Sequence, residues 1–481
     1  MPVQMPDINL VTLLPEILIA LLSLVLLLKS AWGDENRGGS ISAMVIAGVA
    51  IATAITLRGG DTTTFGGFFI NDAFARFMKV LMFLATGLVL FMSQEFMRRN
   101  KFDGGEYQVL TLMALLGGLI MASAGDFIIL YLGLELMSLS IYVLAAFRRD
   151  DKRSNEAGLK YFVLGSMASG FLLYGISLIY GTTGTTLFTG VATALQAGTG
   201  HISPATVMGV ILVLAGMSFK VAAAPFHMWA PDVYEGSPTS VTAFMAVLPK
   251  IAAFAAIFRV LLVAFPTLHV QWNPVLQFLA VASLAVGAVA AIGQTNIKRM
   301  LAYSSIGHVG FILLGLTTHN ALGFQSVLVY LAIYIFTNVG AFAIILLLNR
   351  EGIGDEIDDY KGLARQRPML AILMAMFMFS MAGIPPLAGF MGKLYVFMAA
   401  IEAGQFGLAI TGVLFSAVGA FYYLRIVKLI YFDQPKEGAF TMVMDLPARA
   451  ILTVAGVIIL YWGIFPGALL AWSAAGVKVF L

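Results

Sequence analysis

Four ionisable side chains lie within sequence that is otherwise apolar: Glu135, Lys220, Lys250 and Lys393. An ionised group at the centre of a lipid bilayer costs at least about 2.5–3.5 kcal/mol, so each of these residues needs a specific role. Burial disfavours the charged form of an amine, whereas a nearby carboxylate favours it. A lysine poised between these two effects takes up and releases protons within reach of neutral pH. The four residues are therefore predicted to form a proton relay.

Purely structural roles are the alternative for such residues. A lone lysine can extend its amine to the membrane surface, and one glutamate–lysine pair can simply hold two helices together. Three lysines, however, exceed what the single Glu135 can neutralise, which favours proton transfer for the set. Lys79 and Arg76 lie near the start of an apolar run and are interpreted as structural. Lys160 lies near one end of another run, and both interpretations stay open for it.

Two of the histidines fall where they would extend this relay. His227 follows Pro225, which interrupts an apolar run, and His308 lies about three turns into another run. Ser304 and Ser305 share the helical side of His308. Both histidines are predicted to be secondary proton carriers. A metal site is not expected, because no second ligand lies at the usual spacing and acids are scarce. The remaining histidines fall in predicted outer connections, and no special role is expected for His201, His269 and His319.

The composition places these residues in a membrane protein. Of 481 residues, 60% are hydrophobic and only 11% are charged, less than half the usual charged share. Apolar runs long enough to cross a bilayer recur from end to end, and they are continuous rather than alternating, which excludes a β-barrel. The predicted fold is an all-α polytopic membrane protein. Its start, "MPVQMPDINLVTLLPEIL", lacks the basic region and cleavage site of a signal peptide.

The sequence also excludes several kinds of cofactor site. It contains no cysteine, which excludes disulfides, cysteine-bound iron–sulfur clusters and thiolate metal sites on this chain. It has neither a G-x-G-x-x-G motif after a strand nor a Walker loop. No cofactor is therefore expected on this chain, and no nucleic-acid partner.

Apolar runs bounded by charges, proline or glycine predict about fourteen transmembrane helices. Two of them are predicted to be discontinuous: the seventh, interrupted at Pro225, and the twelfth, interrupted at Pro385 and Pro386. The predicted ranges are 10–29, 40–58, 71–93, 107–124, 126–147, 155–180, 204–224, 239–264, 274–293, 298–316, 321–349, 368–402, 406–428 and 447–472.

Basic residues predict the orientation. Over fourteen spans, lysine and arginine gather in the odd-numbered connections, and the even-numbered connections contain only Arg58. The positive-inside rule then places the odd connections in the cytoplasm and both termini outside. Splitting 368–402 into two spans would break this pattern, which favours one discontinuous helix. The outer connection 181–203 carries no charge, whereas 349–368 mixes acids and bases and is either a solvated loop or a docking surface for a partner subunit.

The two predicted breaks lie about 160 residues apart. Lys220 precedes the first break and Lys393 follows the second, a reversal that a repeat of opposite orientation would produce. Broken helices in corresponding halves are typical of transporters built from inverted repeats. We therefore predict two inverted five-helix repeats within residues 105–430. A three-helix segment at 1–104 precedes them, and a C-terminal helix at 431–481 follows.

Four stretches carry a resemblance to a known family: "LYLGLELMSLSIYVLAAF", "GMSFKVAAAPFHMWAPDVYEGSPTSVTAFMAVLPKIAAF", "NIKRMLAYSSIGHVGFILLGL" and "SMAGIPPLAGFMGKLYVF". They resemble the antiporter-like membrane subunits of respiratory complex I, NADH:quinone oxidoreductase, over roughly residues 105–430. Among these subunits the chain is most similar to the N type. It ends without the long lateral helix of the L type, and Lys393 stands where the M type is expected to have a glutamate.

The resemblance implies a role for each candidate residue. Glu135 would pair with Lys220, Lys250 would be the central relay, joined by His308, and Lys393 would be the terminal site. The chain would pump protons in a complex whose partner subunits carry FMN and iron–sulfur clusters and bind NADH and quinone. Its expected neighbours are another antiporter-like subunit, small membrane subunits and membrane lipids. The Ala- and Gly-rich composition favours a bacterial inner (plasma) membrane.

Three alternatives stay open at this point. The first is a subunit of an Mrp-type cation/proton antiporter, whose members share the same core. The second is a structural subunit that only spaces its neighbours. The third, a homologue in plastids or plant mitochondria, differs only in its compartment.

Overall fold

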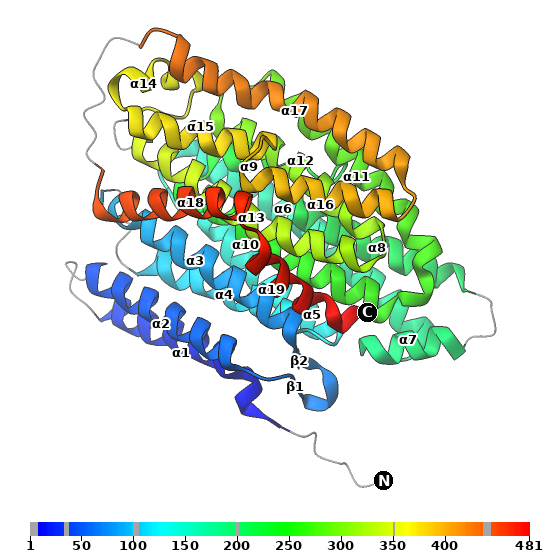
Figure 1. The fold of residues 1–481 in the computed structure, drawn as a ribbon. Coiled ribbons are helices and arrows are strands. Elements are labelled where there is room, and N and C mark those ends of the chain that lie inside the picture. The colour runs from blue at the N-terminus through cyan, green and yellow to red at the C-terminus, as the bar shows by residue number, and fades with distance from the viewer. Residues whose placement is uncertain (1–7, 33–37, 100–104, 198–201, 350–351, 436–443) are drawn as a thin grey trace.

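The computed structural model describes residues 8–32, 38–99, 105–197, 202–349, 352–435 and 444–481. Within these ranges it is a helical bundle in which the α1–α2 pair lies along one edge and α17 along the opposite edge (Figure 1). Thirteen of the described helices are long and apolar enough to cross a membrane. The discontinuous pair α15–α16 supplies one more span. The predicted all-α polytopic fold of about fourteen spans is therefore confirmed.

The bounds of the helices follow the apolar runs closely. The first half contains α1 (Leu14–Ala31), α2 (Gly38–Arg58), α3 (Ala73–Arg99), α4 (Glu106–Ser123), α5 (Phe127–Ala145), α6 (Lys152–Thr183), α7 (Phe188–Ala197), α8 (Pro204–Val221), α9 (Trp229–Gly236) and α10 (Thr239–Arg259). The second half contains α11 (His269–Ile292), α12 (Ile297–Thr317), α13 (Ala321–Asn349), α14 (Leu363–Gln366), α15 (Pro368–Ala382), α16 (Ala388–Glu402), α17 (Phe406–Phe432), α18 (Leu446–Ile464) and α19 (Gly467–Val477).

Polar side chains cap the N-termini of several of these helices, at the points where the apolar runs start. Asp126 caps α5 by accepting hydrogen bonds from the backbone N–H groups of Ile128 and Ile129. Such caps satisfy backbone donors that have no partner within the helix. The same role falls to the side chains of Asp151, Ser203, Asn296 and Asp445.

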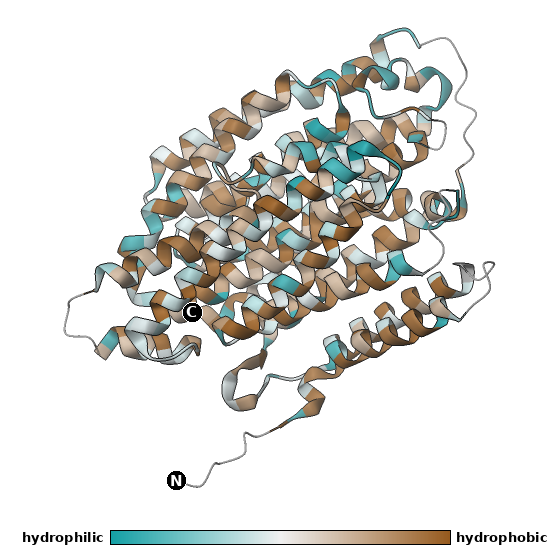
Figure 2. Cartoon of the chain, turned by 180° about the vertical axis from the view of Figure 1, so that it is seen from behind, coloured by the Kyte–Doolittle hydropathy of each residue, from teal (hydrophilic) through white to brown (hydrophobic). Residues whose placement is uncertain are grey.

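The core of the bundle is formed by α10, α12 and α13. The apolar stretch of α13 is buried along its whole length, whereas α17 exposes most of its surface. Hydrophobic residues cover the helices, and hydrophilic residues gather at helix ends and connections (Figure 2). This distribution matches a bundle whose outer surface faces lipid.

Three short features of the fold were not predicted. Strands β1 (Thr62–Thr64) and β2 (Phe69–Asn71) form an antiparallel hairpin before α3. Helix α7 lies in the uncharged connection 181–203. The predicted span 447–472 is wrong as a single helix, because α18 ends at Ile464 and α19 starts after Pro466. Proline lacks an N–H and disfavours helical backbone at the residue before it, which accounts for this stop.

Both predicted breaks are confirmed. Helix α8 ends at Val221, and the next residue, Ala222, has a φ of +60°. Helix α15 ends at Ala382, and the next residue, Gly383, has a φ of +87°, a conformation that glycine adopts without strain. Pro225 and Pro386 then prevent the helix from continuing. The chain therefore runs unwound between α8 and α9 and between α15 and α16.

The polar groups of these breaks find partners inside the protein. The N–H of Ala224 donates a hydrogen bond to Ser283 on α11 at 2.9 Å, and the indole of Trp229 donates to the carbonyl of Phe219 at 3.0 Å. In the second break the N–H of Gly389 donates to Ser380 at 3.1 Å. Unwound backbone at membrane depth is tolerated only where protein or water satisfies it.

Candidate functional site

The amine of Lys220 is held by two hydroxyl groups. Lys220 lies in the last turn of α8 and is buried. Its Nζ donates hydrogen bonds to Ser138 Oγ at 2.8 Å and to Tyr142 Oη at 3.0 Å. Ser138 and Tyr142 are four residues apart on α5, so they lie on one face of that helix. This polar face of α5 is therefore directed into the bundle interior, where Lys220 is buried.

Glu135 lies on the same side of α5, one turn before Ser138. Glu135 is half-buried, and its Oε1 has no hydrogen-bond partner in the described part of the chain. Among the described residues no basic side chain forms an ion pair with Glu135, although its charge acts on Lys220. The direct contact expected between Glu135 and Lys220 is therefore absent from this arrangement, because the Lys220 amine instead donates its hydrogen bonds to the hydroxyl groups of Ser138 and Tyr142.

Lys250 contacts the second half of the broken helix. It is buried near the middle of α10, and its Nζ donates a hydrogen bond of 2.7 Å to Tyr234 Oη on α9. Tyr234 lies in one of the motifs that carry the family resemblance, but its residue type alone did not indicate a role. The break after α8 thus places a phenol against the central lysine.

His308 lies between two tyrosines. Nδ1 is 2.7 Å from Tyr330 Oη on α13, and Nε2 is 3.1 Å from Tyr423 Oη on α17. Ser304 hydrogen-bonds to the Tyr423 hydroxyl, and Ser305 to Tyr334 at 2.8 Å. The two serines beside His308 thus bind further hydroxyl groups.

The amine of Lys393 contacts the C-terminal end of α15, which is the first half of the broken helix. From α16 its Nζ donates a hydrogen bond of 2.8 Å to the carbonyl of Ala382, the last residue of α15. A second bond of 2.9 Å goes to Ser416 Oγ on α17. The carbonyl end of a helix is the negative end of its dipole and favours a cation. Lys393 therefore has an acceptor that exists only because the helix is broken.

His227 is not joined to this group. It lies in the first break, half-buried, and its Nδ1 has no hydrogen-bond partner within the described ranges. Among the described residues, none of the hydrogen bonds connects it to the candidate lysines. Its role as a secondary proton carrier stays a prediction.

A cluster of charges anchors α9 to its neighbours. Asp232 accepts hydrogen bonds from Lys160 on α6 at 2.8 Å and from Arg299 on α12 at 2.6 Å. Arg299 also binds Glu235 at 3.0 Å. These residues line a cleft with a volume of about 220 Å³. The ion pairs favour the structural interpretation of Lys160.

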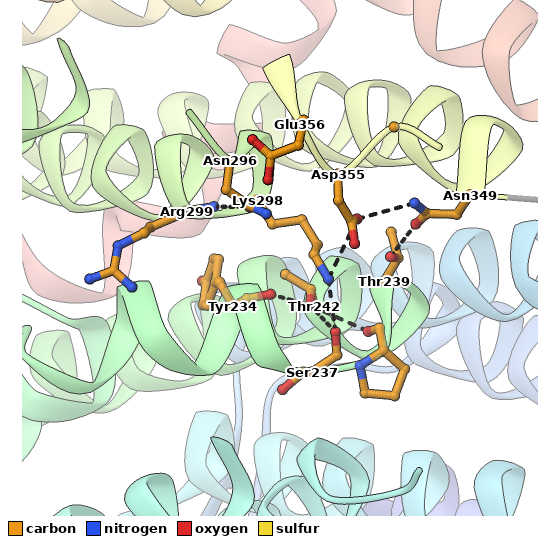
Figure 3. A network of polar contacts seen from close by, with 12 residues as sticks. Tyr234, Ser237, Thr239, Thr242, Asn296, Lys298, Arg299, Asn349, Asp355 and Glu356 are labelled. Carbon is orange, nitrogen blue, oxygen red and sulfur yellow. Dashed lines mark hydrogen bonds and ion pairs between the residues drawn. The ribbon is translucent and has the colours of Figure 1, made fainter. Parts of the chain in front are cut away.

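The junction between α9 and α10 is fixed in a similar way. Lys298 donates a hydrogen bond of 3.2 Å to the carbonyl of Ser237 at the end of α9 and lies 3.7 Å from Asp355 (Figure 3). Asn349 donates to Asp355 at 3.1 Å and hydrogen-bonds to Thr239. From sequence, Lys298 and Arg299 are only two of the basic residues in an odd-numbered connection. In the structure both bind α9, which carries Tyr234.

Replacing Asp232 by asparagine is expected to loosen this anchor. Burial raises the pKa of Asp232, but hydrogen bonds from Lys160 and Arg299 outweigh it and hold the pKa below the ordinary value of 3.8. The stability from a lowered carboxyl pKa is present above that ordinary value and is lost as the pH falls through the folded pKa. We expect a loss of about 1 kcal/mol near pH 7, since the site is partly exposed, and a smaller difference toward pH 4. Thermal unfolding of the purified complex across this range measures it; a difference that grows in acid would contradict the assignment.

Lys79 is far more buried than its position near a span end indicated. Its side chain is 0% exposed, and Nζ lies 2.7 Å from Glu16 Oε1 on α1, which is 5% exposed. Neither group has a hydrogen bond to a third residue among the described parts of the chain. Arg76 instead pairs with Asp61 beside the β-hairpin at 2.7 Å.

The other histidines do not join the central group. His269 and His319 lie with their ring centroids 4.2 Å apart, next to Trp272. His201 lies outside the described residues. Within the part of the chain that the structure describes, no group of three or more His, Cys, Asp or Glu side chains could hold a metal ion.

The site therefore combines buried amines and an imidazole with hydroxyl groups on neighbouring helices. Lys220, Lys250, His308 and Lys393 come from α8, α10, α12 and α16, and each contacts at least one hydroxyl. Hydroxyl groups both donate and accept hydrogen bonds, so they accommodate the neighbouring group with or without its proton. Such an arrangement suits proton transfer between neighbouring stations.

Comparison with known proteins identifies the family of this chain. Residues 124–419 match the family model described as "NADH:quinone oxidoreductase/Mrp antiporter, TM", and the two broken helices with Lys220, Lys250 and Lys393 lie inside that range. The NADH-quinone oxidoreductase subunit N of Magnetococcus marinus is 59% identical over 99% of both chains. The fold and site thus define an antiporter-like membrane protein. Within that class, the chain belongs to the subunit N family of NADH-quinone oxidoreductase, as the resemblance implied.

Solved structures show the same fold. A chain of respiratory complex I from Thermus thermophilus superposes with a TM-score of 0.79 at 33% identity, covering 96% of this chain and 100% of that one. A chain of the Mrp complex from Dietzia sp. reaches a TM-score of 0.83 at 22% identity, covering 98% of both. The second likeness is one of fold alone.

Proposed function

We propose that this chain translocates protons through the relay Lys220, Lys250, His308 and Lys393, as a membrane subunit of NADH:quinone oxidoreductase. The observation that carries the proposal is the row of buried amines, each bonded to a hydroxyl group rather than to a carboxylate. A buried amine locked in a salt bridge would keep its proton. An amine bonded to hydroxyl groups is free to exchange it.

The driving force in this proposal is electrostatic. When the Lys220 amine lies close to Glu135, the carboxylate neutralises its charge. When the amine moves to Ser138 and Tyr142, as seen here, its charge is less compensated and repels a proton on Lys250 toward Lys393. In a poorly screened interior a shift of a few ångströms changes such energies by several kcal/mol. Moving one charge against 100 mV takes about 2.3 kcal/mol, so shifts of this size suffice.

The energy for these shifts comes from the rest of the complex. This chain has no cysteine, and we propose that FMN and iron–sulfur clusters on partner subunits transfer electrons from NADH to quinone. The proposed location is the bacterial inner membrane with both termini on the periplasmic side. The broken pairs α8–α9 and α15–α16 support a division into two inverted repeats within residues 105–430. Docking of 349–368 to a partner subunit stays a prediction.

Removal of either member of the Glu135–Lys220 couple tests the proposal. Lys220→Ala and Glu135→Ala are each expected to lower the number of protons pumped per NADH oxidised, because the charge shift that drives Lys250 is lost. The measurement uses the complex reconstituted in liposomes, with NADH oxidation and acidification recorded together. Unchanged stoichiometry in both variants would remove the proposed mechanism.

The Mrp-type alternative predicts a different result in the same vesicles. Sodium-dependent pH changes without NADH oxidation would favour a cation/proton antiporter. Co-purification of flavin and iron–sulfur absorbance with this chain in mild detergent favours the oxidoreductase. A structural spacer would instead tolerate neutral residues at both Lys250 and Lys393.

A further inference from the structure

Two small cavities flank His308. Each has a volume of about 20 Å³, and a polar cavity of about 10–15 Å³ is enough for one water molecule. Tyr330, Tyr334, Thr337, Asn338 and Ser380 lie around the first, although the surface they present to it is almost entirely apolar. The second is lined by Ser304, Lys393, Ser416, Tyr422 and Tyr423, and part of its surface is polar. The second cavity therefore has both the room and the polar partners for a single water.

Tyr423 is the side chain that connects His308 to the second cavity. Its hydroxyl lies 3.1 Å from His308 Nε2, and it lines the cavity that Lys393 also lines. Ser416, which accepts a hydrogen bond from Lys393, is seven residues before Tyr423 on α17. A spacing of seven places both residues on one face of the helix. One face of α17 thus contacts both His308 and Lys393, with a water-sized space between them.

The other side of His308 faces α13 and the first cavity. Tyr330 binds Nδ1, and Tyr334 lines the first cavity together with His308. Ser305, on the same helix as His308, hydrogen-bonds to Tyr334. An imidazole can accept a proton on one nitrogen and release one from the other. His308 is therefore placed to accept a proton on the side of Tyr330 and to release one on the side of Tyr423.

We propose that Tyr423 is a proton-carrying residue between His308 and Lys393, and that one water in the second cavity completes the connection. This inference rests on the proposed function. The doubly protonated ring of His308 gives the proton on Nε2 to Tyr423 Oη, while the Tyr423 hydroxyl proton passes to the water. The water releases one of its own protons to the neutral amine of Lys393. His308 ends neutral, Lys393 ends protonated, and Tyr423 and the water are unchanged.

The test is Tyr423→Phe in the whole complex reconstituted in liposomes. This change removes one oxygen atom and keeps the aromatic ring. Positioned proton carriers contribute about 10²–10⁴-fold to rate, so we expect NADH-driven proton translocation through this chain to slow by at least about tenfold. The transfer that slows should become rate-limiting, and the ratio of pumping rates in H₂O and D₂O should rise. A loss of packing alone would not raise that ratio.

Two further variants make the outcome decisive. Tyr395→Phe is the matched control, because Tyr395 lies on α16 two residues after Lys393 and has no hydrogen bond among the described residues. It should pump normally. Tyr423→His keeps a group that donates and accepts protons, so it should retain more pumping than Tyr423→Phe. Equal loss in both Tyr423 variants with an unchanged isotope ratio would overturn the proposal, as would normal pumping by Tyr423→Phe.

Lys393→Met separates this inference from the proposed function. If Lys393→Met loses pumping while Tyr423→Phe keeps it, the relay stands and Tyr423 is not part of it. If Lys393→Met pumps normally, the proposed function itself fails.

Discussion

Replacing Lys250 by methionine is expected to lower the protons pumped per NADH without destabilising the complex. Lys250 is the central residue of the proposed relay, and among the described residues its amine has one hydrogen bond, to Tyr234. Methionine has similar length and adapts to the same space, but it carries no proton. Substituting an apolar residue for a buried charge removes its desolvation cost, so stability should be unchanged or slightly higher. Loss of pumping with retained stability would set Lys250 apart from a structural residue.

The measurement pairs acidification of liposomes during NADH oxidation with thermal unfolding of the same preparation. Lys428→Met is the control, because the Lys428 side chain on α17 is 67% exposed and makes only a loose contact with Asp433 at 3.5 Å. That control should pump and melt as the original chain does. Full pumping by Lys250→Met would show that protons bypass the centre of the proposed relay.

The buried pair Glu16–Lys79 is expected to produce the largest effect on stability. Both side chains are almost completely buried, and they contact each other at 2.7 Å between α1 and α3. Removing one partner leaves an uncompensated buried charge, which costs about 3–5 kcal/mol. Glu16→Gln and Lys79→Met should each lower the melting temperature and the yield of assembled complex. The double variant should recover most of the loss, because no charge is then left unpaired.

An exposed pair serves as the comparison. Lys361 and Asp358 lie 2.9 Å apart, with side chains 30% and 53% exposed. Exposed ion pairs contribute about 0–1 kcal/mol, so Lys361→Met should change stability little. If the double variant at Glu16 and Lys79 is no more stable than either single variant, the pair is not a source of the destabilisation.

Hydropathy was sufficient to predict most of the helices, because burial in lipid requires long apolar runs. The two breaks were predictable because Pro225 and Pro386 cannot continue a helix. The hairpin β1–β2 and helix α7 were missed for the opposite reason. Three-residue strands and a ten-residue helix of small residues are too short to leave a periodic pattern.

The site was only half predictable, because sequence indicates residue types but not which distant residues meet. The buried lysines could be identified from sequence because an ionisable side chain in an apolar run has a high desolvation cost. Their partners could not, since a tyrosine or serine in such a run costs far less. Tyr423 lies 115 residues from His308, and Ser138 lies 82 residues from Lys220. Glu16 was overlooked as a partner for Lys79, although a buried carboxylate near a span start was the available signal.

The anchoring of α9 has a mechanical consequence. Consecutive residues of α12, Lys298 and Arg299, attach to the end and the body of α9, and the same α12 carries His308. The two helices are therefore joined at two points. Thr242 of α10 also donates a hydrogen bond of 3.0 Å to the carbonyl of Tyr234, so α10 is attached to α9 as well. The Lys250–Tyr234 contact is thus supported by three connected helices, and a displacement of any one of them would be transmitted to it.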